Sequence, residues 1–119
     1  MGADLYIEKL EREKQYTGFK TDVEAGYYRD SYNDYSILYR LGLSWWVDIG
    51  EMIDKNIGTK HEGKLTPKQC KEFLEILEAN KWKLEKIEED RKFFKEKYRL
   101  LKKFLNKAIE LNSDVICNI

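Results

Sequence analysis

The sequence predicts an α+β domain that is mostly α, in which about four helices pack with a minor two-stranded ribbon from the N- and C-termini. Its 119 residues are typical of one domain, so residues 1–119 are expected to form a single domain. Charged residues make up 37% of the chain and there is one proline, a composition that favours long solvated helices. Apolar residues alternate at period two at both ends of the chain, which favours one short strand at each end.

The two predicted strands are short. The opening run ADLYI predicts a strand over residues 4–8, and in the closing run SDVICNI a second strand places Val115, Cys117 and Ile119 on one face. Two such strands can pair, but a two-stranded ribbon needs a helix packed on it to be stable. After the first strand, residues 9–25 are charged and contain a glycine, which is typical of a short helix or an irregular turn.

The most distinctive stretch runs from GYYRD to GEMI and holds five of the eight tyrosines and two of the three tryptophans. Four of these tyrosines are spaced as on one face of an α-helix, so a helix is expected from about Tyr28 or Ser31 to Leu41. The run RDSYND is also rich in turn and cap formers, so a start near Asn33 or Asp34 is the alternative. The four tyrosines are Tyr28, Tyr32, Tyr35 and Tyr39.

A polar ridge lies one residue around the same predicted helix. It would place two arginines and two smaller hydrogen-bonding side chains beside the tyrosines. The members of this ridge are Arg29, Asn33, Ser36 and Arg40. Gly42 is expected to end the helix in a left-handed conformation, and Ser44 is expected to cap a second helix from about Trp45 to Lys55.

A loop and then a clear helix start follow. Residues 56–65 are expected to form an exposed loop, because they hold two glycines and the only histidine, His61. Thr66, Pro67 and Gln69 predict a capping box with proline at the first helical position.

The segment 67–111 carries one apolar stripe, which is interrupted by Asn80 and Arg91. A single helix of this length would be about 65–70 Å long at 1.5 Å per residue, which is too long for a domain of this size. A break between Asn80 and Asp90 is therefore expected, giving two antiparallel helices. One long helix buried in an oligomer is the alternative.

The aromatic stretch is the candidate binding site. Tyr, Trp and Arg dominate binding hot spots, and they also stack on planar groups and hold phosphates. Adjacent tryptophans on one helix cannot both face one core, so Trp45 or Trp46 is expected outside the core, where it would mark a contact. The alternative is a helix face packed in the core, with the arginines paired to Asp30 and Asp34. The candidate ligand-binding residues are Tyr27, Tyr28, Arg29, Tyr32, Asn33, Ser36, Arg40, Trp45 and Trp46.

No catalytic residue, metal ligand or cofactor is predicted. The sequence carries no GxSxG, P-loop, GxGxxG or HExxH motif. The carboxylate pairs Asp30/Asp34 and Asp48/Glu51 have no histidine with them and are typical of solvated helices. A basic series near the end is interpreted as a solvated face balanced by nearby carboxylates. The series is Lys92, Lys95, Arg99, Lys102 and Lys103.

The bulk composition favours a cytoplasmic location. Basic and acidic residues number 22 each, so the overall charge favours neither nucleic acid nor a membrane as partner. No apolar run reaches membrane-spanning length, and the N-terminus has no signal-peptide core. Cys70 and Cys117 lie in dissimilar contexts and are expected to be buried free thiols.

Three blocks of the sequence carry a family resemblance. MGADLYI begins the chain, GYYRDSYND followed by LGLSWW lies in the middle, and KAIELNSDVICNI closes it. Together they resemble a group of small proteins encoded by bacteriophages and prophages, and the middle block is the most specific of the three. The resemblance implies a bacterial host cytoplasm that phage enters, and it brings no activity with it.

These observations favour non-enzymatic binding. The expected function is that of a phage-encoded counter-defence inhibitor, which sequesters a nucleotide immune signal or occludes a host defence protein. For a nucleotide-like anionic ligand, Arg29 and Arg40 would contact phosphate while a tyrosine or tryptophan stacks on the base. For a host protein, the same residues would anchor an interface. Two alternatives stay open: a small enzyme acting on a nucleotide or nucleic acid, and a structural or assembly protein that forms a homo-oligomer through helices in 67–111.

Overall fold

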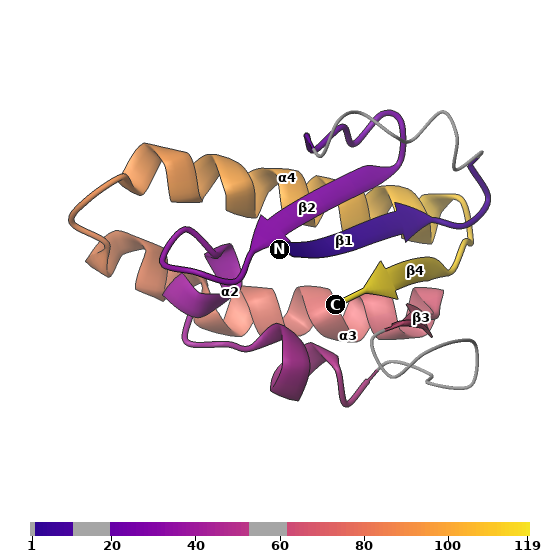
Figure 1. Cartoon of the computed structure of the whole chain (residues 1–119), viewed down its shortest axis with the longest axis horizontal. Coiled ribbons are helices and arrows are strands. Elements are labelled where there is room, and N and C mark those ends of the chain that lie inside the picture. Colours follow the sequence, from indigo (N-terminus) through magenta and orange to yellow (C-terminus); the bar gives the residue numbers. More distant parts are fainter. Residues whose placement is uncertain (1, 11–19, 53–61) are drawn as a thin grey trace.

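A computed structural model describes residues 2–10, 20–52 and 62–119, and in this part of the chain four strands form one antiparallel sheet (Figure 1). The strand order is β2-β1-β4-β3. The strands are β1 (Gly2–Ile7), β2 (Tyr27–Ser31), β3 (Glu62–Leu65) and β4 (Val115–Asn118). The predicted class, a helical domain with a minor two-stranded ribbon, is therefore wrong, because β2 and β3 extend the terminal pair on both sides.

The central pair, β1 and β4, confirms the strands predicted at the two ends of the chain. The two strands are antiparallel, with Leu5 opposite Cys117 and Ile7 opposite Val115. All four side chains are fully buried, as period-two alternation predicts for the face that packs against the helices. The described ends of the chain consequently lie close together in Figure 1.

The helix predicted from Tyr28 or Ser31 to Leu41 is wrong over its first part, where the chain forms β2. This strand pairs with β1, with Tyr28 opposite Leu5. Tyrosine is favoured in strands, and pairing with a central strand outweighs a spacing of tyrosines that also fits a helix. The tyrosines therefore do not share one helical face.

The helix that does form, α2, spans only Ile37–Arg40 and is capped by Ser36. Its start is later than the alternative near Asn33 or Asp34, because the backbone makes a turn there first. The side chain of Asn33 holds this turn by accepting a hydrogen bond from the backbone N–H of Tyr35 at 2.9 Å.

The predicted loop over 56–65 is wrong at its end, where the residues EGKL form β3. Gly63 lies opposite Cys117 of β4. The four residues have little strand character of their own, so the pairing with β4 decides their conformation. The rest of the predicted loop, 56–61 with His61, lies outside the described residues.

Gly42 and Ser44 confirm the predicted connection after α2. Gly42 has a φ of 73°, in the left-handed region that glycine tolerates. The Ser44 side chain accepts hydrogen bonds from two backbone N–H groups of the following helix. That helix, η1, is a single π-type turn over Trp45–Ile49, so it is shorter than predicted, and residues 53–55 of the predicted helix lie outside the described part.

The segment before β2 is described only in part. Of residues 9–25, for which a short helix or an irregular turn is predicted, residues 11–19 lie outside the description. The remainder enters β2 through a turn, in which the backbone N–H and C=O of Asp22 bond to those of Tyr27, both at 2.9 Å. The described residues before β2 thus form an irregular turn.

The long helical segment is broken as predicted. α3 (Pro67–Asn80) begins with the predicted capping box and proline, and the 3-10 helix η3 (Lys81–Lys86) follows it. Asp90, with a φ of 59°, then precedes α4 (Arg91–Glu110). Figure 1 shows α3 and α4 antiparallel on one face of the sheet, so the alternative of one long helix is wrong.

Both helices bury their apolar faces in a core shared with the sheet. Phe94 and Phe104 of α4 are fully buried, and the ring centre of Tyr28 lies 6.0 Å from that of Phe104. Cys70 of α3 and Cys117 of β4 are free thiols in this core, as predicted.

Candidate functional site

A buried carboxylate organises the region of the candidate site. Asp30, on β2, is 1% exposed, and its two oxygens accept hydrogen bonds from five donors. One of the donors is the ammonium of Lys97, which compensates the buried negative charge. The donors are Ser36 Oγ at 2.8 Å, Ile37 N at 3.0 Å, Leu38 N at 3.5 Å, Trp45 Nε1 at 2.8 Å and Lys97 Nζ at 2.6 Å.

These bonds connect three elements to β2. Ser36 is the N-cap of α2, Trp45 is the first residue of η1, and Lys97 lies on α4. One carboxylate therefore fixes the start of α2 and the start of η1 against β2. These hydrogen bonds hold in place the backbone that carries the exposed side chains of Tyr39 and Trp46.

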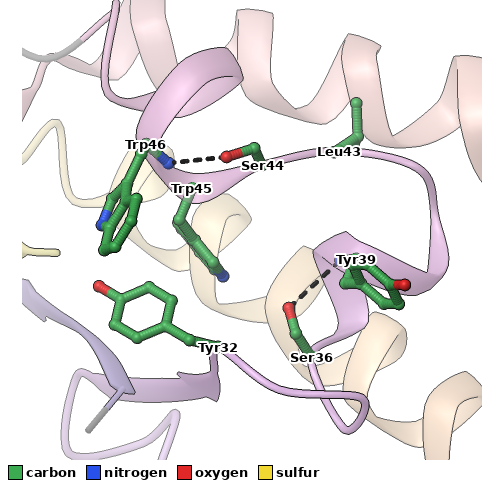
Figure 2. Close-up of a pocket in the computed structure, with 7 residues that line it drawn as sticks. All are labelled: Tyr32, Ser36, Tyr39, Leu43, Ser44, Trp45 and Trp46. Carbon is green, nitrogen blue, oxygen red and sulfur yellow. Dashed lines mark hydrogen bonds between the residues drawn. The ribbon is translucent and has the colours of Figure 1, made fainter.

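A pocket of about 200 Å³ opens in this segment, and we call it the aromatic pocket (Figure 2). It is smaller than the clefts that take drug-sized ligands, about 300–1,000 Å³, and suits a single planar group. Figure 2 shows Tyr32 and Trp46 on one side, Tyr39 on the other and Trp45 between them. The lining residues are Tyr32, Ser36, Tyr39, Leu43, Ser44, Trp45 and Trp46.

Trp46 and Tyr32 form one wall of the aromatic pocket. The indole Nε1 of Trp46 and the hydroxyl of Tyr32 both donate to the main-chain oxygen of Ile119, at 2.8 and 2.6 Å, and their ring centres are 5.4 Å apart. Burial raises the pKa of Tyr32 above 10.0, so the hydroxyl stays a donor at neutral pH. Trp46 is 61% exposed whereas Trp45 is 3% exposed, which confirms that one of the adjacent tryptophans lies outside the core.

A wider depression of about 660 Å³, which we call the cationic groove, adjoins the aromatic pocket and shares Tyr39 with it. Two rings, those of Tyr39 and Trp82, are more than half exposed there. Three cations and two carboxylates line the groove with them. The lining residues are Tyr39, Arg40, Gly42, Trp82, Lys83, Lys86, Ile87, Glu88 and Glu89.

Two of the cations are held from within the protein. Arg40 Nε donates to the main-chain oxygen of Asp34 at 2.9 Å, and the guanidinium carbon lies 4.9 Å from the ring centre of Phe94. Its terminal amino groups have no hydrogen-bond partner among the described residues. Lys83 Nζ donates to the main-chain oxygen of Leu41 at 3.1 Å. Arg40 is thus oriented and still has the planar fork of donors that binds carboxylate or phosphate.

The structure brings five of the nine predicted site residues to these two cavities. Arg40 reaches the cationic groove and the other four line the aromatic pocket. Those four are Tyr32, Ser36, Trp45 and Trp46. The predicted polar ridge does not form. Arg29 lies on strand β2 and Asn33 lies in the turn before α2, so neither shares a helical face with Arg40.

The remaining four predicted residues line neither cavity. Arg29 Nη1 bonds both carboxylate oxygens of Asp4, at 2.8 and 3.0 Å, and the Tyr27 hydroxyl donates to the same carboxylate. Burial is the main cause that raises the pKa of Tyr27. Tyr28 lies in the core, and Asn33 holds the turn before α2. Arg29 and Arg40 therefore do not meet at one ligand position, and the core interpretation holds for Tyr28.

Three groove residues on η3 were missed by the sequence reasoning, namely Trp82, Lys83 and Lys86. They lie in the break between α3 and α4. Trp82 falls outside the apolar stripe that contains Leu77 and Leu84, and it is 59% exposed. A large aromatic residue that departs from the core stripe was the available signal.

The fold is a two-layer α+β arrangement that exposes several aromatic side chains beside two cavities. Comparison with protein-family models, curated proteins and solved structures finds no significant match to this chain. Within the described ranges, no group of three or more His, Cys, Asp and Glu side chains is placed to hold a metal ion. In the same ranges, no helix has both the length and the apolar character that crossing a bilayer requires.

Proposed function

We propose that this protein is a non-enzymatic binding protein that holds a nucleotide-like anionic ligand across the aromatic pocket and the cationic groove. One observation carries the proposal: Tyr39 borders both cavities. A single ligand can therefore place a planar group on one side of this ring and an anionic group on the other.

The planar part of the ligand is recognised by stacking. Tyr39 and Trp46 are each 61% exposed, and both border the aromatic pocket. Stacking of a base on an aromatic side chain contributes about 1–3 kcal/mol and tolerates different bases, since every base has a π-face.

The anionic part is recognised by the cations of the groove. Arg40 offers its terminal amino groups to phosphate oxygens, and Lys86, which has no ion-pair partner among the described residues, adds a second positive charge. Arg29, the other predicted phosphate ligand, is bound to Asp4. In the proposal, Lys83 and Lys86 of the groove therefore replace it as phosphate ligands.

The described side chains around both cavities favour binding over catalysis. Nucleophilic catalysis needs a nucleophile hydrogen-bonded to an oriented base. The hydroxyls of Ser36 and Ser44 instead cap helices. The carboxylate of Asp30 is enclosed by its five donors and is not open to a substrate.

The biological role that we propose is counter-defence. The three sequence blocks that resemble phage and prophage proteins support a setting in which a host signals infection with nucleotides. A protein that binds such a signal without converting it lowers the free concentration of the signal. Binding alone is sufficient for this role.

Occlusion of a host defence protein is the second candidate, and Tyr35 and Phe93 favour it. They are 54% and 45% exposed, meet edge to face with ring centres 6.0 Å apart, and line neither cavity. A small ligand leaves this pair uncovered, whereas a protein interface would cover it together with Tyr39.

The third candidate, a homo-oligomer through helices in 67–111, has less support. The apolar face of α4, with Phe94, Leu101 and Leu105, is buried in the core of a single chain. We expect the molecular mass in solution to be that of one chain. A concentration-dependent increase in mass would favour the assembly candidate instead.

Titration of the purified protein with cyclic nucleotides and NAD-derived signals tests the proposal. We expect binding by calorimetry for at least one of them, with quenching of tryptophan fluorescence because Trp46 and Trp82 line the cavities. Heat denaturation should then release the ligand unchanged, as chromatography will show. Release of a product would favour the enzyme alternative, and absence of binding to every nucleotide would leave the protein-occlusion candidate.

Point variants test whether the ligand binds at these two cavities. Trp46→Ala should weaken nucleotide binding roughly ten-fold or more, because it removes a stacking surface. Arg40→Ala should weaken binding of the phosphate-bearing ligand more than binding of the free nucleoside. Lys92→Ala, on the exposed side of α4, is the matched charge control and should bind as the wild type does. Equal binding by all three variants would contradict the placement.

A further inference from the structure

A third pocket lies on the other side of η3, and we call it the basic pocket. Its volume is about 350 Å³. Four cations and one carboxylate line it, together with Leu84 and Tyr98. The cations are Lys81, Lys95, Arg99 and Lys102, and the carboxylate is Glu85.

Tyr98 is the unusual member of this pocket. Its side chain is 4% exposed, and its hydroxyl is buried without a hydrogen-bond partner, the one such side-chain atom in the described part of the chain. A buried polar group without a partner destabilises the folded protein, so a native hydroxyl in this state calls for an explanation. The simplest explanation is that a ligand in the basic pocket supplies the acceptor for this hydroxyl.

The protonation state of Tyr98 suits a donor. Burial, with a smaller contribution from the carboxylate of Glu78, raises the pKa of Tyr98 to about 12. The hydroxyl therefore keeps its proton throughout the physiological range and can donate it to an anionic oxygen.

The cations around Tyr98 are available to a ligand. Three of the four are paired with carboxylates, but all six of these side chains are between two fifths and two thirds exposed. The pairs are Lys95 with Glu85 at 2.8 Å, Lys102 with Glu78 at 2.8 Å and Arg99 with Glu96 at 2.5 Å. Exposed ion pairs contribute little and rearrange easily, so these lysines can move aside and turn toward a ligand. Lys81 has no ion-pair partner among the described residues.

We propose that the basic pocket binds the phosphate group of a small phosphomonoester, with the Tyr98 hydroxyl donating a hydrogen bond to a phosphate oxygen. A phosphate dianion offers several acceptor oxygens and fits a pocket with four cations better than a singly charged carboxylate does. When the ligand enters, the exposed lysine side chains of the lining reorient toward its phosphate group. The organic part of the ester contacts Leu84, the apolar member of the lining.

This site is separate from the one in the proposed function. Different residues of η3 line the two cavities. Trp82 and Lys83 line the cationic groove, whereas Lys81 and Leu84 line the basic pocket. Variants in one therefore leave the other intact. Failure of phosphomonoester binding would not bear on Tyr39, nor would failure of nucleotide binding there bear on Tyr98.

The test uses phenyl phosphate and inorganic phosphate as probes, with sodium chloride at matched ionic strength as the reference. We expect both phosphates to raise the melting temperature of the wild type above the chloride reference, phenyl phosphate more strongly because its ring contacts Leu84. Calorimetry should show that Tyr98→Phe weakens phenyl phosphate binding roughly ten- to hundred-fold, the effect of one hydrogen bond to a charged group. Lys81→Ala should also weaken it, whereas Lys92→Ala, outside the pocket, should not.

Tyr98→Phe carries a second readout that needs no ligand. In phosphate-free buffer this variant should melt at the same temperature as the wild type or higher, because it removes a buried hydroxyl without a partner. A lower melting temperature would show that the hydroxyl is already satisfied, for example by a bound water, and would overturn the proposal. Equal phosphate binding by wild type and Tyr98→Phe, or no stabilisation beyond chloride, would overturn it as well.

Discussion

The indole Nε1 of Trp45 donates a hydrogen bond to the carboxylate of Asp30 at 2.8 Å, and both side chains are buried. This bond ties η1 to β2 beneath the aromatic pocket. The same carboxylate binds Lys97 at 2.6 Å. Asp30 is therefore the residue on which the geometry of the candidate site depends most.

Asp30→Asn should destabilise the protein by about 2–4 kcal/mol, because the amide nitrogen turns toward hydrogen-bond donors and Lys97 loses its counter-charge. The free energy of unfolding in urea measures the effect. Asp34→Asn is the matched control, since Asp34 is exposed and should change stability by less than about 0.5 kcal/mol. If the two variants unfold alike, Asp30 does not support the site in the manner described.

The three tryptophans should differ in acrylamide quenching. Trp46 and Trp82 are 61% and 59% exposed, whereas Trp45 is 3% exposed. The double variant Trp46→Phe, Trp82→Phe should therefore lose most of the quenchable emission and keep the slow quenching of a buried indole. Trp45→Phe should show the opposite change. Strong quenching of the double variant would mean that Trp45 is accessible.

The two thiols should resist modification in the folded protein. Burial raises the pKa of Cys70 to about 12, and it also raises the pKa of Cys117, so neither forms the reactive thiolate near neutral pH. A disulfide-exchange reagent at pH 8 should react with both thiols only after unfolding in urea. Immediate reaction of one thiol in native buffer would contradict the burial of that residue.

Exposed ion pairs should give a small acid-sensitive contribution to stability. The hydrogen bond from Lys102 lowers the pKa of Glu78 below 4.5, and the bond from Lys95 lowers the pKa of Glu85 in the same way. Because the folded pKa lies below the unfolded one, this stabilisation is present above pH 4.5 and is lost as the pH falls through the folded value.

The double variant Glu78→Gln, Glu85→Gln tests this contribution. The fall in melting temperature between pH 7 and pH 3 should be smaller in the variant than in the wild type. Added salt should narrow the difference, since both pairs are exposed and screened. An identical pH dependence in the two proteins would show that the pairs contribute nothing to stability.

The local signals in the sequence led to correct predictions wherever neighbouring residues decide the conformation. Thr66 and Gln69 form the predicted capping box, and Gly42 takes the predicted left-handed turn. The break after Asn80 also follows from the chain itself, because one helix over 67–111 would outgrow a domain of this size. Exposure of one of the adjacent tryptophans was also predictable, because two neighbouring residues of one helix cannot both face one core.

The candidate site was predictable only in part. Tyr32, Trp45 and Trp46 meet in one pocket, as an aromatic-rich segment suggests. Arg29 does not join them, because in a strand it faces Asp4 on the neighbouring strand. Trp82 joins the site from a segment distant in sequence, and no local pattern connects it to Tyr39.

The sequence by itself specified the caps, the terminal strands and the burial of the cysteines, and through the length of the chain it also specified the helix break. The tertiary structure decided that residues 27–31 and 62–65 are strands. The reason is energetic: local propensities differ by less than about 1 kcal/mol per residue, whereas pairing with a central strand satisfies a whole row of backbone hydrogen bonds. Those pairings then determined that Arg29 and Arg40 lie apart, and that Asp30, rather than an arginine, connects the elements around the site.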